Sequence, residues 1–217
     1  LKEETAETFT IGVVLEPRWV EGLTVTVDYW DIEIQDAIES VSAQDIVDNC
    51  YDAAPAGFPN QFCSLISRNP ADTDPTTPDF GFNFLRQTEV NFGALEASGV
   101  DFTANYGFEA LRGSWNVGIA GTWMDKIDQF FDPADPTAVN PELGEIQRPE
   151  WAGTGTVTYA TGPLSIRWQT MYQDEQLHSA AEIEDFQTVF GSAAVLDEFY
   201  KHDLSFSYDW DETIQVY

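Results

Sequence analysis

Apolar and polar residues alternate along several stretches of this chain, most regularly from Leu23 to Tyr29. Leucine, two valines and tyrosine occupy the odd positions there, and two threonines and an aspartate occupy the even ones. A period of two with β-branched and aromatic residues on one side predicts a β-strand with one apolar and one polar face. After Trp30 the apolar positions shift to Ile32 and Ile34, which predicts a β-bulge of one extra residue.

This strand is unusually long. It extends over up to 14 residues, from Leu23 to Asp36, whereas a strand of a soluble sheet usually has about 5–6 residues. A tilted strand that crosses a bilayer needs about 9–11 residues. The length therefore suits a transmembrane strand.

Similar alternation predicts six more strands, and an eighth begins at Thr213. The six cover residues 8–15, 88–108, 115–123, 151–161, 164–172 and 204–210. The connections are alternately short and long, and the long ones cover residues 37–87, 126–149 and 174–200. Tight turns at one end and long loops at the other are typical of an outer-membrane barrel. The expected fold class is all-β, an antiparallel meander of about seven to eight strands that is part of a large transmembrane β-barrel with long extracellular loops and short periplasmic turns.

The two faces of the predicted strands differ in chemistry. One carries aliphatic residues, with aromatic residues near the strand ends, as at a membrane interface. The other carries mainly Thr, Ser, Asn, Gln and Gly, as in a watery or plugged lumen. A soluble β-sandwich also alternates in this way. The regular short and long connections weigh against it, and so does the lack of lysine on the strands, because the edges of a soluble sheet need protection.

Charge and composition exclude several classes of protein and one class of partner. The chain has 217 residues, with 9 Lys and Arg against 38 Asp and Glu and a formal net charge of −29. This balance argues against nucleic acid as a partner. With 43% hydrophobic and 14% aromatic residues, the chain is too apolar for a disordered acidic tail. No apolar run reaches the ~18 residues of a transmembrane helix, and the opening LKEETAE has no signal-peptide pattern.

Two cysteines lie in the first long loop. Cys50 and Cys63 are thirteen residues apart in a stretch rich in Pro, Gly and Asn. The spacing suits a disulfide that closes a loop in an oxidising compartment, and it matches no zinc pattern. Just before Cys50, Ser42 followed by Asp45 predicts the N-cap and first-turn acid of a short helix.

Candidate metal ligands occur in the other predicted loops. His178 and His202 are expected at opposite ends of the third long loop, near the outer rim. Nearby acids are Asp174, Glu175 and Asp203, and imidazole with carboxylate suits a divalent transition metal. Two solvated rim histidines are the simpler interpretation.

Three acidic groups offer oxygen ligands for Ca²⁺. They are Asp72/Asp74/Asp79, Asp125/Asp128/Asp132/Asp135 and Glu182/Glu184/Asp185. None has the spacing of a known calcium loop, so a solvated surface is again the simpler interpretation. The sequence has no Ser–His–Asp order, HExxH, phosphate loop or dinucleotide fingerprint. We therefore expect no enzyme, no cofactor and no metal centre.

Several phrases, taken in order, resemble the C-terminal barrel region of TonB-dependent outer-membrane receptors. They are TFTIGVVLEP, VTVDYWDIEIQDAI, the two-cysteine loop NCYDAAP…NQFC, and VNFGALEASGVDFTANY, which carries that family's Gly-x-Asp/Glu pattern at Gly99 to Asp101. The resemblance covers roughly Glu3 to Trp210. It implies import, in which extracellular loops bind a substrate and an energised inner-membrane partner pulls on a plug that fills the barrel.

The resemblance also implies that residues 1–217 are one part of a larger barrel domain. A complete receptor of this kind has about 22 strands around a plugged lumen. The plug, its coupling box and the early strands are then expected before Leu1, and the closing strands after Tyr217. The implied location is the outer membrane of a Gram-negative bacterium. The implied partners are outer-membrane lipid and lipopolysaccharide, the receptor's own plug domain and a TonB-type energy-coupling protein.

By the alternation, Asp101, Arg167 and Asp209 are expected to face the lumen and to contact the plug or water. The expected function is uptake of a large nutrient such as a siderophore, cobalamin or an oligosaccharide. The alternative is a secreted or surface β-sandwich that binds carbohydrate through loop aromatics such as Trp30, Phe130 and Phe131.

Overall fold

The computed structural model describes residues 1–51, 59–70, 80–91, 93–130, 137–210 and 213–217. The chain packs as two compact units. Residues 1–7, 33–95 and 129–140 form the first, which we call the loop unit, and residues 8–32, 96–128 and 141–217 form the second, the sheet unit. In the described ranges, α1 (Ala43–Tyr51) and α2 (Ile183–Phe190) are short, and no helix has the length and apolar character needed to cross a membrane.

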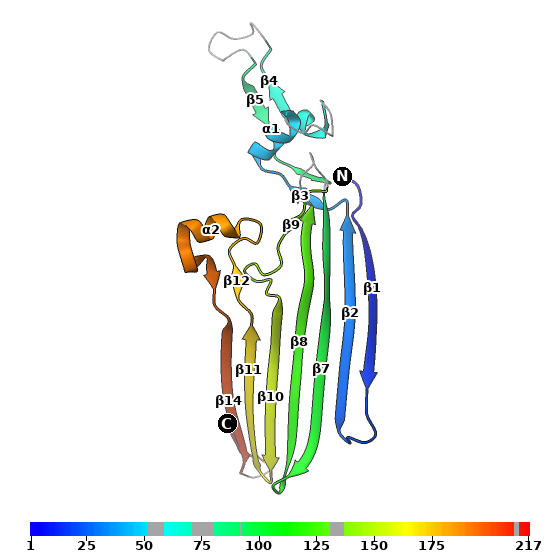
Figure 1. Cartoon of the computed structure of the whole chain (residues 1–217), viewed down its shortest axis with the longest axis vertical. Coiled ribbons are helices and arrows are strands. Elements are labelled where there is room, and N and C mark those ends of the chain that lie inside the picture. Colours follow the sequence, from blue (N-terminus) through cyan, green and yellow to red (C-terminus); the bar gives the residue numbers. More distant parts are fainter. Residues whose placement is uncertain (52–58, 71–79, 92, 131–136, 211–212) are drawn as a thin grey trace. The chain divides into compact units, whose positions relative to one another are not determined.

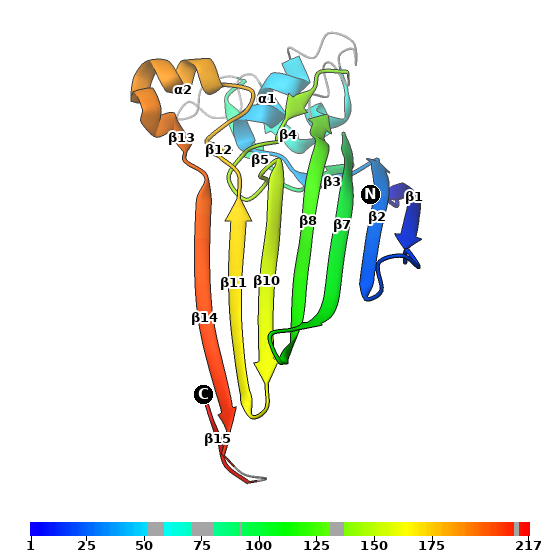
Figure 2. The same cartoon turned by 60° about the horizontal axis from the view of Figure 1, so that its bottom comes forward.

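Long strands form one large sheet, with each long strand next to its neighbour along the chain. In order across the sheet the long strands are β1 (Thr5–Leu15), β2 (Leu23–Gln35), β7 (Ala94–Ala110), β8 (Gly113–Phe130), β10 (Trp151–Thr161), β11 (Leu164–Gln173) and β14 (Phe199–Asp209), and the short β15 (Gln215–Val216) follows β14. β9 (Asn140–Pro141) pairs with β8 off this path. Figures 1 and 2 show the long strands side by side in this order. The predicted all-β antiparallel meander is confirmed.

Three small two-stranded sheets and two 3₁₀ turns lie in the long connections. These sheets pair β3 (Ile38–Ser40) with β6 (Glu89–Asn91), β4 (Ile66–Arg68) with β5 (Phe82–Leu85), and β12 (Gln176–Leu177) with β13 (Val195–Leu196). The 3₁₀ turns are η1 (Gln61–Leu65) and η2 (Gly191–Ala194). The helix expected after Ser42 is confirmed as α1, and the Ser42 hydroxyl accepts a hydrogen bond from the Asp45 amide at 3.2 Å. α2 and the three small sheets were not predicted.

The register of the sheet keeps like residues on one face. One row across β8, β10, β11 and β14 is Val117–Val157–Trp168–Leu204, and the next is Asn116–Thr158–Arg167–Ser205. A slip of one residue would mix these rows, so the pattern specifies the pairing. The sheet therefore has one apolar face and one polar face, as the alternation predicts.

Aromatic rings gather toward both ends of the apolar face. The ring centroids of Trp115 and Tyr159 are 4.6 Å apart, and those of Trp123 and Trp151 are 6.0 Å apart. Trp115 and Trp123 are eight residues apart in β8, which spans about 27 Å along the strand. That distance is close to the ~25 Å apolar band of a membrane barrel, which aromatic girdles flank.

The alternation of β2 continues across Trp30, and the bulge predicted after that residue stays a prediction. The Tyr29 hydroxyl donates to the Asp31 carboxylate, two residues on, at 3.3 Å, so these two side chains share a face. The Trp30 indole lies against Gly99 of β7 instead. Trp30 is thus a strand residue and not the loop aromatic of the sandwich alternative.

The predicted absence of lysine from the strands is wrong. Lys126 of β8 pairs with Glu96 at 2.6 Å, and Lys201 of β14 pairs with Asp203 at 3.3 Å. Both fall in segments expected to be loop, because β8 continues to Phe130 and β14 already begins at Phe199. Lys126 pairs with Glu96 of the neighbouring strand, and Lys201 pairs with Asp203 of its own strand. Each lysine is therefore partnered by an acid where its strand extends beyond the predicted end.

Candidate functional site

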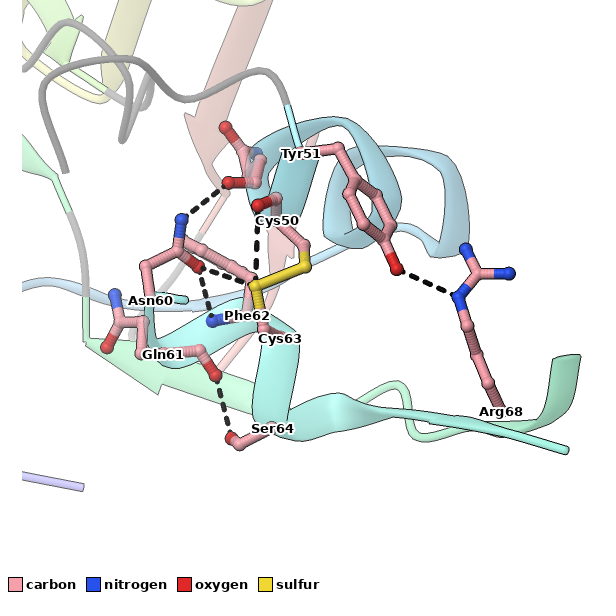
Figure 3. The surroundings of a disulfide bond; sticks show 9 residues. Cys50, Tyr51, Asn60, Gln61, Phe62, Cys63, Ser64 and Arg68 are labelled. Atoms are coloured by element: carbon pink, nitrogen blue, oxygen red, sulfur yellow. Dashed lines mark hydrogen bonds between the residues drawn. A yellow bond between two sulfur atoms is a disulfide. The ribbon is translucent and has the colours of Figure 1, made fainter. Parts of the chain in front are cut away.

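The loop unit is closed by a disulfide between Cys50 and Cys63, which confirms the pairing that the sequence predicts (Figure 3). Cys50 lies in α1 and Cys63 in η1. Asn60 links the same two elements, because its Nδ2 donates to the Asn49 carbonyl at 2.7 Å and its Oδ1 accepts from the Phe62 amide at 3.0 Å. A covalent bond and two hydrogen bonds therefore hold α1 against η1.

A small apolar core surrounds this disulfide. Ile46 and Phe62 are 0% and 1% exposed, and Val41 and Cys50 pack with them. Leu65, Ile66 and Leu85 are partly buried against the same cluster. Because Ile66 and Leu85 pair across the β4–β5 hairpin, the core also anchors that hairpin.

Arg68, at the end of β4, is held by aromatic residues. Its Nε donates to the Tyr51 hydroxyl at 2.8 Å (Figure 3), and its Nη1 donates to the Phe80 carbonyl at 2.8 Å. The guanidinium carbon lies 4.2 Å from the centroid of the Phe82 ring and 5.2 Å from that of Tyr51. These are cation–π distances. We call Tyr51, Arg68, Phe80 and Phe82 the Arg68 cluster.

The rings of the Arg68 cluster are open to solvent. Tyr51, Phe80 and Phe82 are 47%, 61% and 51% exposed. Phe80 also has φ 60°, a left-handed conformation that is rare for a bulky residue and is found at functional sites. A fixed cation between exposed rings can bind a planar or apolar ligand group through the rings and an anionic group through the guanidinium.

The three residues predicted to face the lumen lie on three different strands of the sheet and do not contact one another. Asp101 of β7 accepts a hydrogen bond from the Thr122 hydroxyl at 2.5 Å. Arg167 of β11 donates to Gln169 at 3.1 Å. Asp209, at the end of β14, accepts from Gln215 at 2.6 Å. Each is exposed, and the partner of each lies on the same strand or on an adjacent one.

A shallow hollow lies beside Asp101. Its volume is about 420 Å³, and residues of β7, β8, β10 and β11 line it with more apolar than polar surface. They include Asp101, Thr103, Thr122, Thr154 and Gln173.

Two long connections of the sheet unit are joined to each other at the loop end. Arg148 pairs with Glu142 at 2.5 Å and contacts Glu145 at 3.7 Å. Glu145 in turn accepts from the amide of Ala180 at 2.9 Å, and it forms a parallel bridge with Leu177. These contacts are not predictable from the sequence, since no local pattern signals a contact between two loops.

The two histidines occupy different surroundings. His178 lies in a loop, with its ring 4.4 Å from that of Phe186 in α2. The prediction that His202 lies in the rim loop is wrong. It is part of β14, paired with Thr170 on the apolar face, and its ring is 5.7 Å from that of Trp168. The cause is the earlier start of β14, which draws residues 199–203 into the sheet.

The acidic groups show no metal site in the part of the chain that the structure describes. No three or more His, Cys, Asp or Glu side chains gather there in an arrangement for a metal ion. Asp125 accepts from the Ser98 hydroxyl at 3.3 Å, and Glu184 and Asp185 lie in the first turn of α2, where they complement the helix dipole. Asp72, Asp74, Asp79, Asp132 and Asp135 lie outside the described residues.

A meander of long strands with one apolar face, one polar face and aromatic rows is the architecture of a segment of a membrane β-barrel. The sequence model of TonB-dependent receptor-like β-barrels matches residues 1–217. The chain therefore belongs to the TonB-dependent receptor β-barrel family, a family of receptors and transporters. No protein of curated function matches the sequence significantly.

Solved receptors share the fold. The ferric enterobactin receptor PfeA of Pseudomonas aeruginosa is similar with a TM-score of 0.56 at 15% identity, over 99% of this chain and 25% of the receptor. The siderophore receptor PirA of Acinetobacter baumannii gives 0.52 at 13% identity, over 99% and 27%. The FrpB iron transporter of Neisseria meningitidis gives 0.50 at 17% identity, over 96% and 24%. The chain thus spans about a quarter of the length of the receptors it matches.

Proposed function

We propose that this chain is part of an outer-membrane receptor that takes up a ferric siderophore by TonB-dependent transport. The family match over the whole chain supports a receptor. The names of the solved neighbours, which are receptors or transporters for iron or siderophores, support the substrate class. The observation that carries the proposal is the Arg68 cluster, a fixed cation between exposed rings on a disulfide-closed loop unit.

The Arg68 cluster suits such a substrate for a physical reason. The chain as a whole is strongly acidic, with a net charge of −29, which disfavours an anionic ferric chelate at long range. Arg68 is one of only nine basic residues, and its guanidinium is held in place by Tyr51 and Phe80. A chelate that presents aromatic rings can stack on Phe82 and place negative charge on Arg68, which offsets the unfavourable field locally.

The partners of this receptor follow from the same proposal. We place the chain in the outer membrane of a Gram-negative bacterium, with its apolar face against membrane lipid and lipopolysaccharide. The polar face, with Asp101, Arg167, Asp209 and the hollow beside Asp101, then contacts a plug domain or water. A TonB-type protein supplies the energy through the plug. Because the chain covers about a quarter of PfeA, we propose that it is one segment of a longer receptor.

The carbohydrate-binding sandwich finds no support. A sandwich buries its apolar faces between two sheets, but Ile11 of β1 is 61% exposed and Leu204 of β14 is 73% exposed. Trp30 lies within β2. Phe130 ends β8, and Phe131 lies outside the described residues.

Uptake by the full-length receptor tests the proposal. Cells that carry it are supplied with radioactive iron as catecholate or hydroxamate chelates, and with labelled cobalamin and a maltooligosaccharide, with and without TonB. We expect TonB-dependent uptake of a ferric chelate. Uptake of cobalamin or oligosaccharide alone would refute the siderophore assignment, and uptake of none in a correctly inserted receptor would refute the transport proposal.

The Arg68→Gln variant tests the site itself. Loss of a charge-assisted hydrogen bond and a cation–π contact should weaken binding of the chelate by about 10- to 100-fold. Arg86→Gln is the matched control, because Arg86 is an exposed arginine of the same unit outside the cluster. Equal effects of the two substitutions would show that general charge, and not the cluster, attracts the ligand.

A further inference from the structure

A hollow, which we call the trench, lies over β10 on the apolar face of the sheet. Its volume is about 280 Å³, and its lining is almost entirely apolar. Gly153 and Gly155 of β10 form its floor. Phe102 and Ile119 lie on one side, and Thr170 and Tyr172 lie on the other. These are lining residues of a single continuous hollow that spans four strands.

The trench exists because two successive positions on this face of β10 lack side chains. Gly153 pairs with Gly121 and Tyr172, and Gly155 pairs with Ile119 and Thr170. Glycine inside a strand weakens it and often marks a site where a ligand approaches the backbone closely. A floor of two glycines between rows of larger side chains therefore needs an explanation.

Backbone packing explains one of these glycines but not the other. A Cβ atom at Gly153 would lie 3.0 Å from the Ala120 carbonyl oxygen of β8, so the neighbouring backbone itself favours glycine there. A Cβ atom at Gly155 would meet only the methyl group of Thr170, at 3.1 Å. The backbone around Gly155 therefore does not require glycine, and the space above this residue is open because the residue has no side chain.

Aromatic rings lie at the outer end of the trench. Trp151 lines that end, and its ring lies 6.4 Å from that of Phe102 and 6.0 Å from that of Trp123. Trp123 and Trp151 belong to the aromatic row at the loop end of the sheet. The trench therefore starts just inside this row and extends toward the middle of the apolar face, the depth at which lipid chains lie next to a barrel.

We propose that the trench binds one acyl chain of a membrane lipid. This proposal rests on the proposed function in one respect, because the apolar face must be in contact with the membrane. The size favours a single chain over a compact ligand, since about 280 Å³ is slightly below the ~300–1,000 Å³ of ordinary small-molecule pockets. The lining offers dispersion contacts and almost no hydrogen-bonding group, which matches a hydrocarbon chain and disfavours a polar ligand.

Photo-crosslinking in nanodiscs tests the trench. The full-length receptor is reconstituted with phosphatidylethanolamine that carries a diazirine in its acyl chain, and crosslinked residues are mapped by mass spectrometry. We expect crosslinks to concentrate on Ile119, Trp151 and Tyr172. In Gly155→Leu, which fills the trench, they should fall about tenfold, the change expected when about two buried methylene groups lose their contacts.

Val157→Leu is the matched control. Val157 is two residues further along β10 on the same face and does not line the trench, so this substitution should leave the crosslinks unchanged. Should Gly155→Leu fail to insert, Ile119→Trp fills the trench from its wall, because Ile119 is half exposed. Heat-modifiable migration in gel electrophoresis reports insertion of each variant.

Two further outcomes separate this proposal from the function on which it rests. Crosslinks spread evenly over the apolar face, including Val157 and Ile166, would show a membrane-embedded sheet without a chain-binding trench and would overturn the inference. The absence of crosslinks from the whole face would show that the sheet does not contact lipid and would overturn the proposed membrane location as well.

Discussion

Gly99 shows how a short sequence pattern acquires a physical meaning. The Gly-x-Asp phrase at Gly99–Asp101 is part of the resemblance to TonB-dependent receptors, but the sequence alone gives no reason for the glycine. In the structure, a Cβ atom at this position would lie 2.9 Å from the Trp30 ring and 2.7 Å from the Trp123 carbonyl oxygen. The missing side chain lets Trp30 of β2 lie across β7.

Gly99→Ala should therefore destabilise the receptor by about 1–3 kcal/mol, because overpacking forces a ring or a strand to move. Gly107→Ala is the matched control in the same strand, since a Cβ atom there would meet only the Trp115 carbonyl oxygen, at 4.0 Å. We expect this control to be neutral or slightly stabilising. Urea unfolding in detergent micelles, followed by tryptophan fluorescence, measures both. Equal stabilities would show that Trp30 does not depend on Gly99.

Thr170 carries a polar atom that lacks a hydrogen-bond partner in the described part of the structure. Its Oγ1 is buried and has no hydrogen-bond partner in the described part of the structure. In contrast, the hydroxyl oxygens of Thr26 and Thr103 are 2.6 Å apart and share a hydrogen bond. A buried polar group that makes no hydrogen bond lowers stability, whereas a paired one is roughly balanced or favourable.

Thr170→Val should consequently raise the free energy of unfolding by about 1 kcal/mol, because it removes an unpaired hydroxyl at nearly constant volume. Thr103→Val should lower it by a similar amount, because it leaves the hydroxyl of Thr26 without its partner. The same urea titration compares the two variants with the parent. A loss of stability in Thr170→Val would indicate that the hydroxyl has a partner in the membrane.

At the scale of elements, the first long connection is a folded unit with its own core. α1, η1 and the β4–β5 hairpin bury Ile46 and Phe62 and are closed by the Cys50–Cys63 disulfide. So small a core gives little stability by itself. The disulfide and the Asn60 hydrogen bonds must therefore provide much of the order that positions Arg68.

Replacing both cysteines by serine should destabilise the loop unit by about 3 kcal/mol, the value expected for a loop of this length. Amide hydrogen exchange should become faster in α1, η1 and β4, while β10 and β11 of the sheet unit stay protected. Chemical reduction of the parent protein should reproduce this pattern and is the control for the substitutions. Exchange that also accelerates throughout the sheet would contradict a local role of the disulfide.

At the scale of the whole chain, the sheet is a ribbon with one apolar face and two edges. β1 lies at one edge of the path, and β14 pairs beyond β11 only with the short β15, through Tyr208 and Asp209. Long unpaired edges promote association with other strands, and large exposed apolar surfaces promote insertion into lipid or aggregation. Residues 8–15 and 199–207 combine both properties.

Residues 1–217 produced alone should therefore need detergent. In plain buffer we expect large assemblies in analytical ultracentrifugation, and in mild detergent a much smaller particle with the same β-rich circular dichroism spectrum. A monodisperse monomer in plain buffer would contradict the assignment of the exposed face to lipid. A urea-denatured sample refolded in each buffer controls for the history of the preparation.

Much of the fold could be predicted, because alternation is a local property. The strands at 151–161 and 164–173 begin and end almost where the pattern places them, and the apolar and polar rows have the expected residues. The ends of β8 and β14 were misplaced because charged residues such as Lys126 and Lys201 resemble loop residues in the sequence. Their ion pairs with Glu96 and Asp203 appear only once the structure brings the partners together.

The candidate sites were largely beyond local prediction. Cys50 and Cys63 could be paired from their spacing, but Arg68 is separated by seventeen residues from Tyr51 and by fourteen from Phe82. Nothing in the sequence between them indicates that the three meet. The same is true of the trench, which needs the pairing of Gly155 with Ile119 and Thr170 on two different strands.

The order of apolar and polar residues by itself determined that this chain forms long, two-faced strands joined by alternately short and long connections, since each strand's faces depend only on its own residues. The tertiary structure alone decided which side chains meet, because contacts across strands and within the loop unit depend on hydrogen-bond register and on packing between distant residues. The Arg68 cluster, the place of Trp30 over Gly99 and the trench on β10 all belong to this second group.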